Sequence, residues 1–221
     1  MNRKINAIIF DADGLMINTE YVAMLAWQQT GREFGYEIPL EVHQQVIGLS
    51  IEASEKVMLR IFGDDFPYYE LRKRRLEIAR AHVQENGMPV KKGVFELLDY
   101  LDSLGIPKAV ATSSDRDGAK YKLEMAGLFD RFGAVITNDD VQNGKPAPDI
   151  FLAAARSIAA NPAECLVLED SEPGIRGALA AGMLPVMVPD LKPPSPEITQ
   201  VVHKIFPTLH EVREWLQVVW K

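Results

Sequence analysis

Five short apolar runs constrain the fold of this chain more than any other feature of its sequence. Each run has the length and composition of a strand that is buried on both faces. The runs are residues 5–10, 107–111, 134–136, 165–168 and 184–188. Helical patterns alternate with them, over residues 94–104, 118–126, 149–159 and 174–181. This alternation predicts an α/β fold, in which right-handed crossovers build a parallel sheet with helices on both faces.

The residues between the first and second runs break this alternation. Residues 19–88 contain no convincing strand pattern, and helical periodicity covers residues 21–34, 40–46, 51–61 and 68–84. We therefore expect two domains, a core of residues 1–17 and 90–221 and an inserted helical domain of residues 18–89. Residues 190–196 contain several prolines and predict a surface loop, followed by a last short strand and a C-terminal helix.

Composition and charge limit the partners that this chain could have. It has 221 residues, 47% hydrophobic and 25% charged, which allows a sizeable core without disulfides. Its net charge of −7 argues against nucleic acid, because basic proteins gain affinity there by releasing counterions. The one basic run, residues 72–75, lies in an amphipathic stretch. We interpret it as a solvated helix face rather than a nucleic-acid or membrane patch.

The apolar runs are also too short for a membrane-spanning helix, which needs about 18 residues or more. The run near the N-terminus is too short for a signal peptide and ends in acidic residues. Cys165 is the only cysteine and lies in an apolar run, so a buried thiol is favoured over a reactive one. We expect no membrane partner and a location in the reducing cytoplasm.

Two carboxylates follow the first apolar run directly. Asp11 would be the first residue beyond the strand, and Asp13 would return to the same side in an extended chain. Ligands of open α/β sheets bind beyond the carboxyl ends of the strands. Two such close carboxylates favour either a cation between them or a protonated Asp13, and Gly14 permits the turn that aims both. The alternative is an acidic turn without chemistry.

A second strand also ends in adjacent carboxylates, Glu169 and Asp170. Mg²⁺ prefers oxygen ligands and takes few of them from the protein, so Asp11, Asp170 and a backbone carbonyl, with Glu169 nearby, could hold it. The alternative is the N-cap region of a following helix, and the two interpretations are compatible.

Two further segments supply donors to the same edge of the predicted sheet. Thr112, Ser113 and Ser114 follow the second run, where hydroxyl and backbone N–H groups form a phosphate cradle. Lys145 lies in a proline-containing loop that would hold its charge in a fixed position. The alternatives are ordinary helix caps and a surface lysine.

In their order, spacing and strand context, these segments resemble the four motifs of the haloacid dehalogenase superfamily. The resemblance is to the phosphatase and phosphomutase branch of subfamily I, which has a helical cap after the first motif. Motif one corresponds to residues 11–14, motif two to Thr112, motif three to Lys145 and motif four to residues 169–170. The resemblance implies a Rossmann-like core, with residues 18–89 as the cap and hinges near residues 15–19 and 87–91.

The resemblance also implies roles for these residues. Asp11 would be the nucleophile that accepts a phosphoryl group, and Asp13 the general acid and then the general base. Thr112 and Lys145 would hold the phosphoryl oxygens, with Ser113 and Ser114 beside them. The ligands of Mg²⁺, the implied cofactor, would be Asp11, the backbone carbonyl of Asp13, Glu169 and Asp170.

Among the activities of this family, we expect a phosphatase for a small phosphorylated metabolite, such as a sugar or nucleotide-like monophosphate. Asp13 argues against a dehalogenase, because departing halide needs no proton. A β-phosphoglucomutase-like mutase is the alternative. It calls for a cap cation after the turn at residues 48–50, where this chain has Ile51. Lys56 or Arg60 could substitute. A non-catalytic binding protein on the same fold is a third hypothesis, and we expect a monomer or weak dimer.

Overall fold

The computed structural model describes residues 4–220, and the chain divides into two compact units. One consists of Met1–Asn18 and Val90–Lys221, and the other of Thr19–Pro89. The first boundary lies one residue later than the sequence predicted, and the second lies where it was expected.

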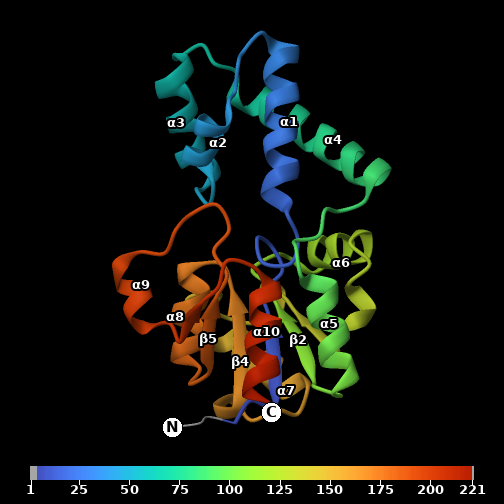
Figure 1. Cartoon of the computed structure of the whole chain (residues 1–221). Coiled ribbons are helices and arrows are strands. Elements are labelled where there is room, and N and C mark those ends of the chain that lie inside the picture. Colours follow the sequence, from blue (N-terminus) through green and yellow to red (C-terminus); the bar gives the residue numbers. More distant parts are fainter. Residues whose placement is uncertain (1–3, 221) are drawn as a thin grey trace. The chain divides into compact units, whose positions relative to one another are not determined.

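The core unit is built on a parallel sheet, and its six described strands have the order β3-β2-β1-β4-β5-β6 (Figure 1). The strands are β1 (Ala7–Phe10), β2 (Lys108–Ala111), β3 (Ala134–Ile136), β4 (Cys165–Glu169), β5 (Leu184–Met187) and β6 (Lys204–Ile205). This confirms the predicted α/β fold. The chain moves outward from β1 to β3 and then returns to the other side of β1, so the order reverses beside β1. Such a reversal is the usual place for a ligand site in this class of sheet.

Helices cover both faces of this sheet, which explains why its inner strands are apolar except for Lys108 and Glu169 at their ends. On one face, α7 (Asp149–Ser157) and α8 (Glu172–Ala180) pack against a cluster that includes Ile9, Phe151 and Val167. On the other face lie α5 (Val94–Ser103) and α10 (Leu209–Val219), which pack against each other (Figure 1). Their leucines, such as Leu98 and Leu216, are fully buried.

The core unit contains further helices besides these four. They are α6 (Arg116–Met125), α9 (Pro196–Val201) and the 3₁₀ helices at Phe129–Arg131, Asn138–Asp140 and Pro162–Glu164. The sequence did not predict α9, which begins at the end of the expected loop. Ser195 caps it by accepting a hydrogen bond from the Ile198 N–H, and Pro196 suits the first helical position because it needs no N–H there.

The second unit consists of four helices, as the periodicity of residues 19–88 predicted. They are α1 (Thr19–Phe34), α2 (Leu40–Val46), α3 (Ile51–Phe62) and α4 (Tyr68–Asn86). Their shared core includes Trp27, Met58 and Leu71, and the rings of Trp27 and Tyr68 stack at 6.1 Å. This core is separate from the clusters that cover the sheet, so the helical unit has its own hydrophobic interior.

The two segments that lead out of and back into the core unit lie side by side within it. Ile17 forms a bridge with Val90, and the Lys91 N–H donates to the Met16 carbonyl oxygen at 2.8 Å. Met16 and Ile17 are completely buried. The backbone is therefore tied down immediately before and after the insertion, and the predicted hinges would have to lie beyond these contacts.

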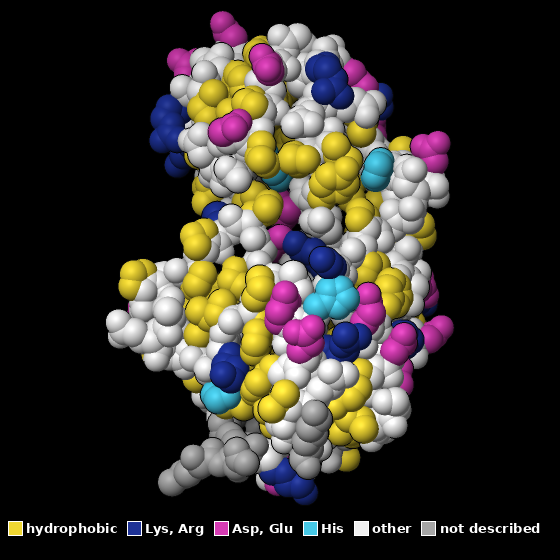
Figure 2. All heavy atoms as spheres, viewed as in Figure 1, with side chains coloured by type: hydrophobic (Ala, Val, Ile, Leu, Met, Phe, Trp, Pro, Cys, Tyr) yellow, Lys and Arg dark blue, Asp and Glu magenta, His cyan; other side chains and the backbone are white. Residues whose placement is uncertain are grey.

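The surface carries charges of both signs. On the face shown in Figure 2, acidic side chains lie beside basic ones in many places. No helix of the described residues is long and apolar enough to cross a membrane. Cys165 is buried as expected, and burial raises the pKa of its thiol to about 11, which makes it a poor nucleophile.

Candidate active site

Seven of the eight predicted site residues lie at the carboxyl ends of β1, β2 and β4, on either side of the strand-order reversal, and Lys145 lies in the connection between β3 and α7. The Asp11 N–H donates to the Leu168 carbonyl of β4, and the Thr112 N–H donates to the Ile136 carbonyl of β3, each at 3.0 Å. The sheet ladder therefore continues to the residues from which the site side chains project. This is why segments more than 150 residues apart in sequence meet in one place.

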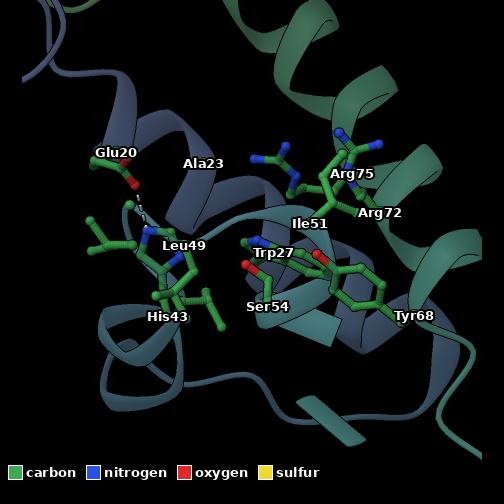
Figure 3. A pocket seen from close by; sticks show the side chains of 13 residues that line it. Glu20, Ala23, Trp27, His43, Leu49, Ile51, Ser54, Tyr68, Arg72 and Arg75 are labelled. Carbon is green, nitrogen blue, oxygen red and sulfur yellow. Dashed lines mark ion pairs between the residues drawn. The ribbon is translucent and has the colours of Figure 1, made fainter. Parts of the chain in front are cut away.

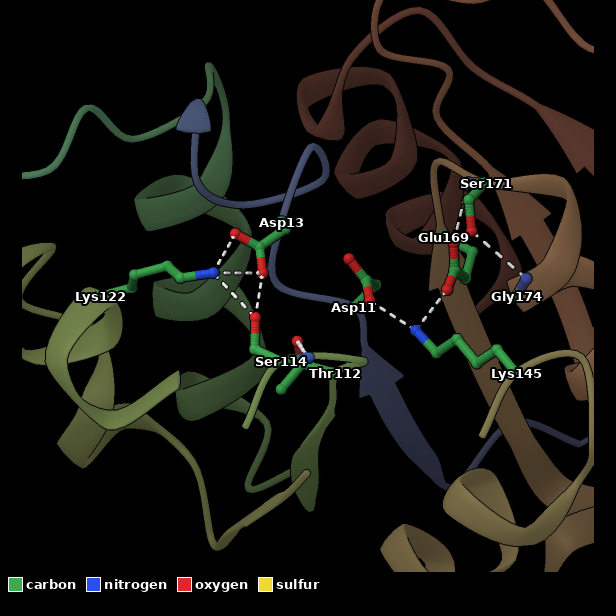
Figure 4. A network of polar contacts seen from close by, with 9 residues as sticks. All are labelled: Asp11, Asp13, Thr112, Ser114, Lys122, Lys145, Glu169, Ser171 and Gly174. Atoms are coloured by element: carbon green, nitrogen blue, oxygen red, sulfur yellow. Dashed lines mark hydrogen bonds and ion pairs between the residues drawn. The ribbon is translucent and has the colours of Figure 1, made fainter. Parts of the chain in front are cut away.

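At the centre of the site, Lys145 lies between two carboxylates (Figure 4). Its Nζ donates to Asp11 Oδ1 at 2.5 Å and to Glu169 Oε1 at 2.6 Å. All three side chains are at most 8% exposed. The two carboxylates raise the pKa of Lys145 against the opposing effect of its burial, so its ammonium group stays charged. A fixed positive charge thus lies beside Asp11.

The orientation of Glu169 is fixed by hydrogen bonds from Ser171, the N-cap residue of α8. Glu169 Oε2 accepts hydrogen bonds from the backbone N–H and the hydroxyl of Ser171, both at 2.8 Å. A Cβ atom on Gly174 would lie 1.8 Å from Glu169 Oε1, so only glycine leaves room for this carboxylate. Both oxygens of Glu169 therefore already have protein donors, which the sequence could not reveal.

The Asp170 carboxylate lies beside Gly14 of the first motif. A Cβ on Gly14 would lie 2.2 Å from Asp170 Oδ2, and Gly14 has a positive φ of 88°. Both observations explain why glycine follows Asp13. Asp190, which lies close to Gly14 and forms an ion pair with Lys91, was not predicted as a site residue.

The electrostatics of this site disfavour its own negative charges. Burial raises the pKa of Asp11 to about 7, where the effect of Glu169 adds to it and that of Lys145 opposes it. Burial also raises the pKa of Asp170, with further contributions from the negative charges of Glu169, Asp11 and Asp190. One lysine does not neutralise this group of acids, so the site favours an additional cation.

Asp13 takes part in a second network (Figure 4). Lys122 Nζ donates to both oxygens of Asp13, at 2.7 and 2.8 Å, and Ser114 Oγ donates to Asp13 Oδ2 at 2.8 Å. Sequence analysis missed Lys122. Helical side chains point towards the N-terminus of their helix, so any long lysine of α6 could reach back to the strand ends, but this signal does not single out Lys122.

The three hydroxyl residues after β2 have different environments. Thr112 is 1% exposed, and its Oγ1 accepts a hydrogen bond from the Ser114 N–H at 3.2 Å. The Ser114 hydroxyl contacts Asp13 and Lys122, as described above. Ser113 is exposed to solvent. The structure therefore brings Thr112 and Ser114 into the site interior and leaves Ser113 at its rim.

The model of the haloacid dehalogenase-like hydrolase family matches residues 8–188, a span that contains all eight predicted site residues. The chain belongs to this family.

Two curated relatives and one solved structure are similar to this chain over most of its length. The probable pseudouridine-5'-phosphatase of Drosophila melanogaster is 34% identical over 194 residues, covering 85% of this chain and 83% of its own length. The β-phosphoglucomutase of Bacillus subtilis is 30% identical and covers 82% of each chain. A hydrolase of this family from Deinococcus radiodurans, with bound phosphate and sodium, superposes with a TM-score of 0.86. It is 25% identical, over 99% of this chain and 97% of its own.

Proposed function

We propose that this protein is a phosphatase that hydrolyses a small organic phosphomonoester and carries the phosphoryl group on Asp11. The observation that supports this most strongly is the buried arrangement of Asp11, Lys145 and Glu169 at the strand-order reversal. A carboxylate beside a fixed ammonium can attack phosphorus, and the ammonium can then neutralise phosphoryl oxygens. Relatives named as phosphatases support the same reaction class.

The proposed reaction has two steps. In the first, an oxygen of Asp11 bonds to phosphorus while the bond to the ester oxygen breaks, and protonated Asp13 gives its proton to the departing oxygen. In the second, Asp13 takes a proton from a water molecule, which attacks phosphorus while the bond between phosphorus and the Asp11 oxygen breaks, so that inorganic phosphate leaves and the Asp11 carboxylate is restored. Thr112, Ser113, Ser114 and Lys145 would position the phosphoryl oxygens in both steps.

The donor set fits a Mg²⁺ ion, with Asp11 and Asp170 as side-chain ligands and the backbone carbonyl of Asp13 as a third. The described residues contain no ready group of three acidic, histidine or cysteine ligands. Mg²⁺ often takes only one or two carboxylates and keeps several waters, so two suffice. The raised pKa values of Asp11 and Asp170 support this fit, because a cation would offset their burial and mutual repulsion. When bound, Mg²⁺ would supply charge neutralisation for the phosphoryl group.

Glu169 would act through Lys145 and Ser171, since both of its oxygens already accept hydrogen bonds.

A sugar phosphomutase is the second candidate, and the relative named β-phosphoglucomutase favours it. Position 51, however, carries an isoleucine that is 40% exposed, and Lys56 is also exposed. Arg60 donates to the Gln45 side chain at 3.3 Å. None of these three residues is a positioned cation near the turn at residues 48–50. Arg72 and Arg75 line a pocket together with Gly48 and Leu49, so the choice between hydrolysis and phosphoryl return rests on the experiment with glucose 1-phosphate. A non-catalytic binding protein is disfavoured, because none of the reacting groups is missing.

Hydrolysis of p-nitrophenyl phosphate, with and without Mg²⁺, tests the proposal. We expect release of p-nitrophenol that depends on Mg²⁺; absence of turnover in both conditions would favour a binding protein. Incubation with glucose 1-phosphate separates the two enzymes. A phosphatase releases inorganic phosphate, whereas rapid formation of glucose 6-phosphate with little phosphate release would show a mutase.

A further inference from the structure

The basic run at residues 72–75 separates into two groups on α4. Arg74 points to acidic neighbours, with ion pairs to Glu33 at 2.6 Å and to Glu77 at 3.2 Å, and Lys73 is exposed. This part of the run fits the solvated face that the sequence predicted. Arg72 and Arg75 lie one turn apart and line a pocket within the helical unit (Figure 3). For these two arginines, the interpretation as a solvated face is incomplete.

The pocket lies between the four helices of this unit and has a volume of about 220 Å³. That is the space of roughly seven liquid water molecules, enough for a carboxylate or phosphate group with a few attached atoms. The Arg75 guanidinium carbon lies 5.5 Å from the centre of the Trp27 ring, which fixes it over an aromatic face. Ser54 and Tyr68 add hydroxyl groups to the lining.

The charges in this pocket are not balanced. Arg72 and Arg75 form no ion pair within 4 Å among the described residues, and the Nε of Arg75 is buried without a hydrogen-bond partner. Burial lowers the pKa of Arg75, and the charge of Arg72 lowers it further. The one carboxylate in the lining, Glu20, lies 3.2 Å from His43 Nε2. Two guanidinium groups thus share this pocket with a single carboxylate, and neither of them forms an ion pair with it.

We propose that this pocket binds a small organic anion through Arg72 and Arg75. A guanidinium group presents paired N–H donors that match the oxygens of a carboxylate or phosphate, and such charge-assisted hydrogen bonds are strong. The anion would supply both the missing negative charge and an acceptor for the free Nε of Arg75. Its source is either a second anionic group of the substrate, which rests on the proposed phosphatase function, or a separate effector.

Tryptophan fluorescence offers a direct binding test, because Trp27 lies in the pocket. Replacing Trp215 and Trp220 by Phe leaves Trp27 as the only tryptophan of the full chain. This protein is titrated with malonate and with inorganic phosphate, without Mg²⁺, and with sodium chloride at matched ionic strength as the control. We expect saturable changes with at least one of the two anions. Arg72→Gln and Arg75→Gln should each weaken binding about tenfold, as expected for loss of a hydrogen bond to a charged group.

Arg74→Gln is the matched control, since it removes the same charge from the same helix. We expect it to bind like the parent, and Arg72→Lys, which keeps the charge, to fall between the two. Thermal unfolding shows whether each variant is folded. The proposal is overturned if neither anion changes Trp27 fluorescence beyond the sodium chloride control, or if Arg74→Gln weakens binding as much as the other two.

Kinetics on two matched substrates distinguishes the two possible sources of the anion. The substrates are 2-phosphoglycolate, which carries a carboxylate, and 2-hydroxyethyl phosphate, which carries a hydroxymethyl group in its place. If the substrate supplies the anion, Arg72→Gln should lower kcat/KM for 2-phosphoglycolate about tenfold more than for 2-hydroxyethyl phosphate. If an effector supplies it, malonate should change hydrolysis of both substrates, and Arg72→Gln should abolish this response. Turnover of p-nitrophenyl phosphate by the parent tests the phosphatase function separately, so the two failures are distinguishable.

Discussion

Replacing Glu169 by Gln should destabilise the core unit and slow catalysis, although the two side chains have nearly the same shape. Glu169 Oε1 accepts from Lys145, and Oε2 accepts from two donors of Ser171. An amide offers only one acceptor oxygen, and its NH₂ group is a donor. Whichever way the amide is turned, its NH₂ group therefore faces either the Lys145 ammonium or the Ser171 donors.

The size of the effect follows from this mismatch. The loss of one buried hydrogen bond to a charged group costs about 2–3 kcal/mol of unfolding free energy. For a protein of this size, that lowers Tm by about 4–12 °C. Lys145 would keep only Asp11 as a partner, and a lysine that is no longer fixed should reduce kcat/KM by about tenfold to hundredfold.

Thermal unfolding without Mg²⁺ measures the change in Tm without a contribution from metal binding. Hydrolysis of p-nitrophenyl phosphate measures the change in kcat/KM. The matched control is Glu172→Gln, three residues further along the chain at the start of α8. Glu172 accepts one hydrogen bond, from the Ser195 N–H at 2.8 Å, and an amide oxygen can replace it, so we expect a change within about 0.5 kcal/mol. If Glu169→Gln behaves like this control in both assays, Glu169 does not hold Lys145 in place.

Three further predictions concern the same site. Asp13→Asn should slow hydrolysis of alkyl phosphates by about 10²–10⁴-fold and that of p-nitrophenyl phosphate much less, because a good leaving group needs little help from an acid. Steady-state kinetics on both esters checks this, and equal losses would argue against the acid role. Lys122→Met should lower kcat on alkyl phosphates by about tenfold through misplacement of Asp13, with Lys120→Met as the control on the same helix. An unchanged kcat would show that the Lys122 contact does not position Asp13. Without Mg²⁺, burial raises the pKa of Asp11 from 3.8 to about 7, so the folded state favours protonated Asp11. The resulting stability is present below about pH 4 and is lost as the pH rises towards about 7, and Mg²⁺ should restore stability most at the upper end. Tm measured across this range with EDTA and with Mg²⁺ tests the sign, and a metal-free Tm that rises with pH relative to Asp11→Asn would contradict it.

The sequence was sufficient to predict which backbone segments meet in the site. Asp11, Thr112 and Glu169 directly follow or end apolar runs, and parallel strands bring their carboxyl ends to one edge. Gly14 was also predictable, because the first motif has to turn between Asp13 and the following residues. These predictions depend on local patterns that a single sequence contains.

The partners of the site side chains were not predictable in the same way. Lys122 lies 109 residues from Asp13, and nothing in the helical pattern of α6 distinguishes it from Lys120, which is exposed. The fixed orientation of Glu169 depends on the space beside Gly174, which appears only after α8 packs against β4. The separation of Arg72 and Arg75 from Arg74 likewise depends on where α1 places Glu33 and Trp27. The expected monomer or weak dimer and the cytoplasmic location stay predictions.

The central claim is that Asp11 carries the phosphoryl group, and an acid quench during turnover tests it most directly. The protein is mixed with a phosphomonoester substrate and Mg²⁺, quenched in acid, digested and examined by mass spectrometry. We predict that the peptide containing Asp11 gains the mass of one phosphoryl group, and that Asp11→Asn shows neither this modification nor phosphate release. Phosphate release by Asp11→Asn at the wild-type rate would contradict the account.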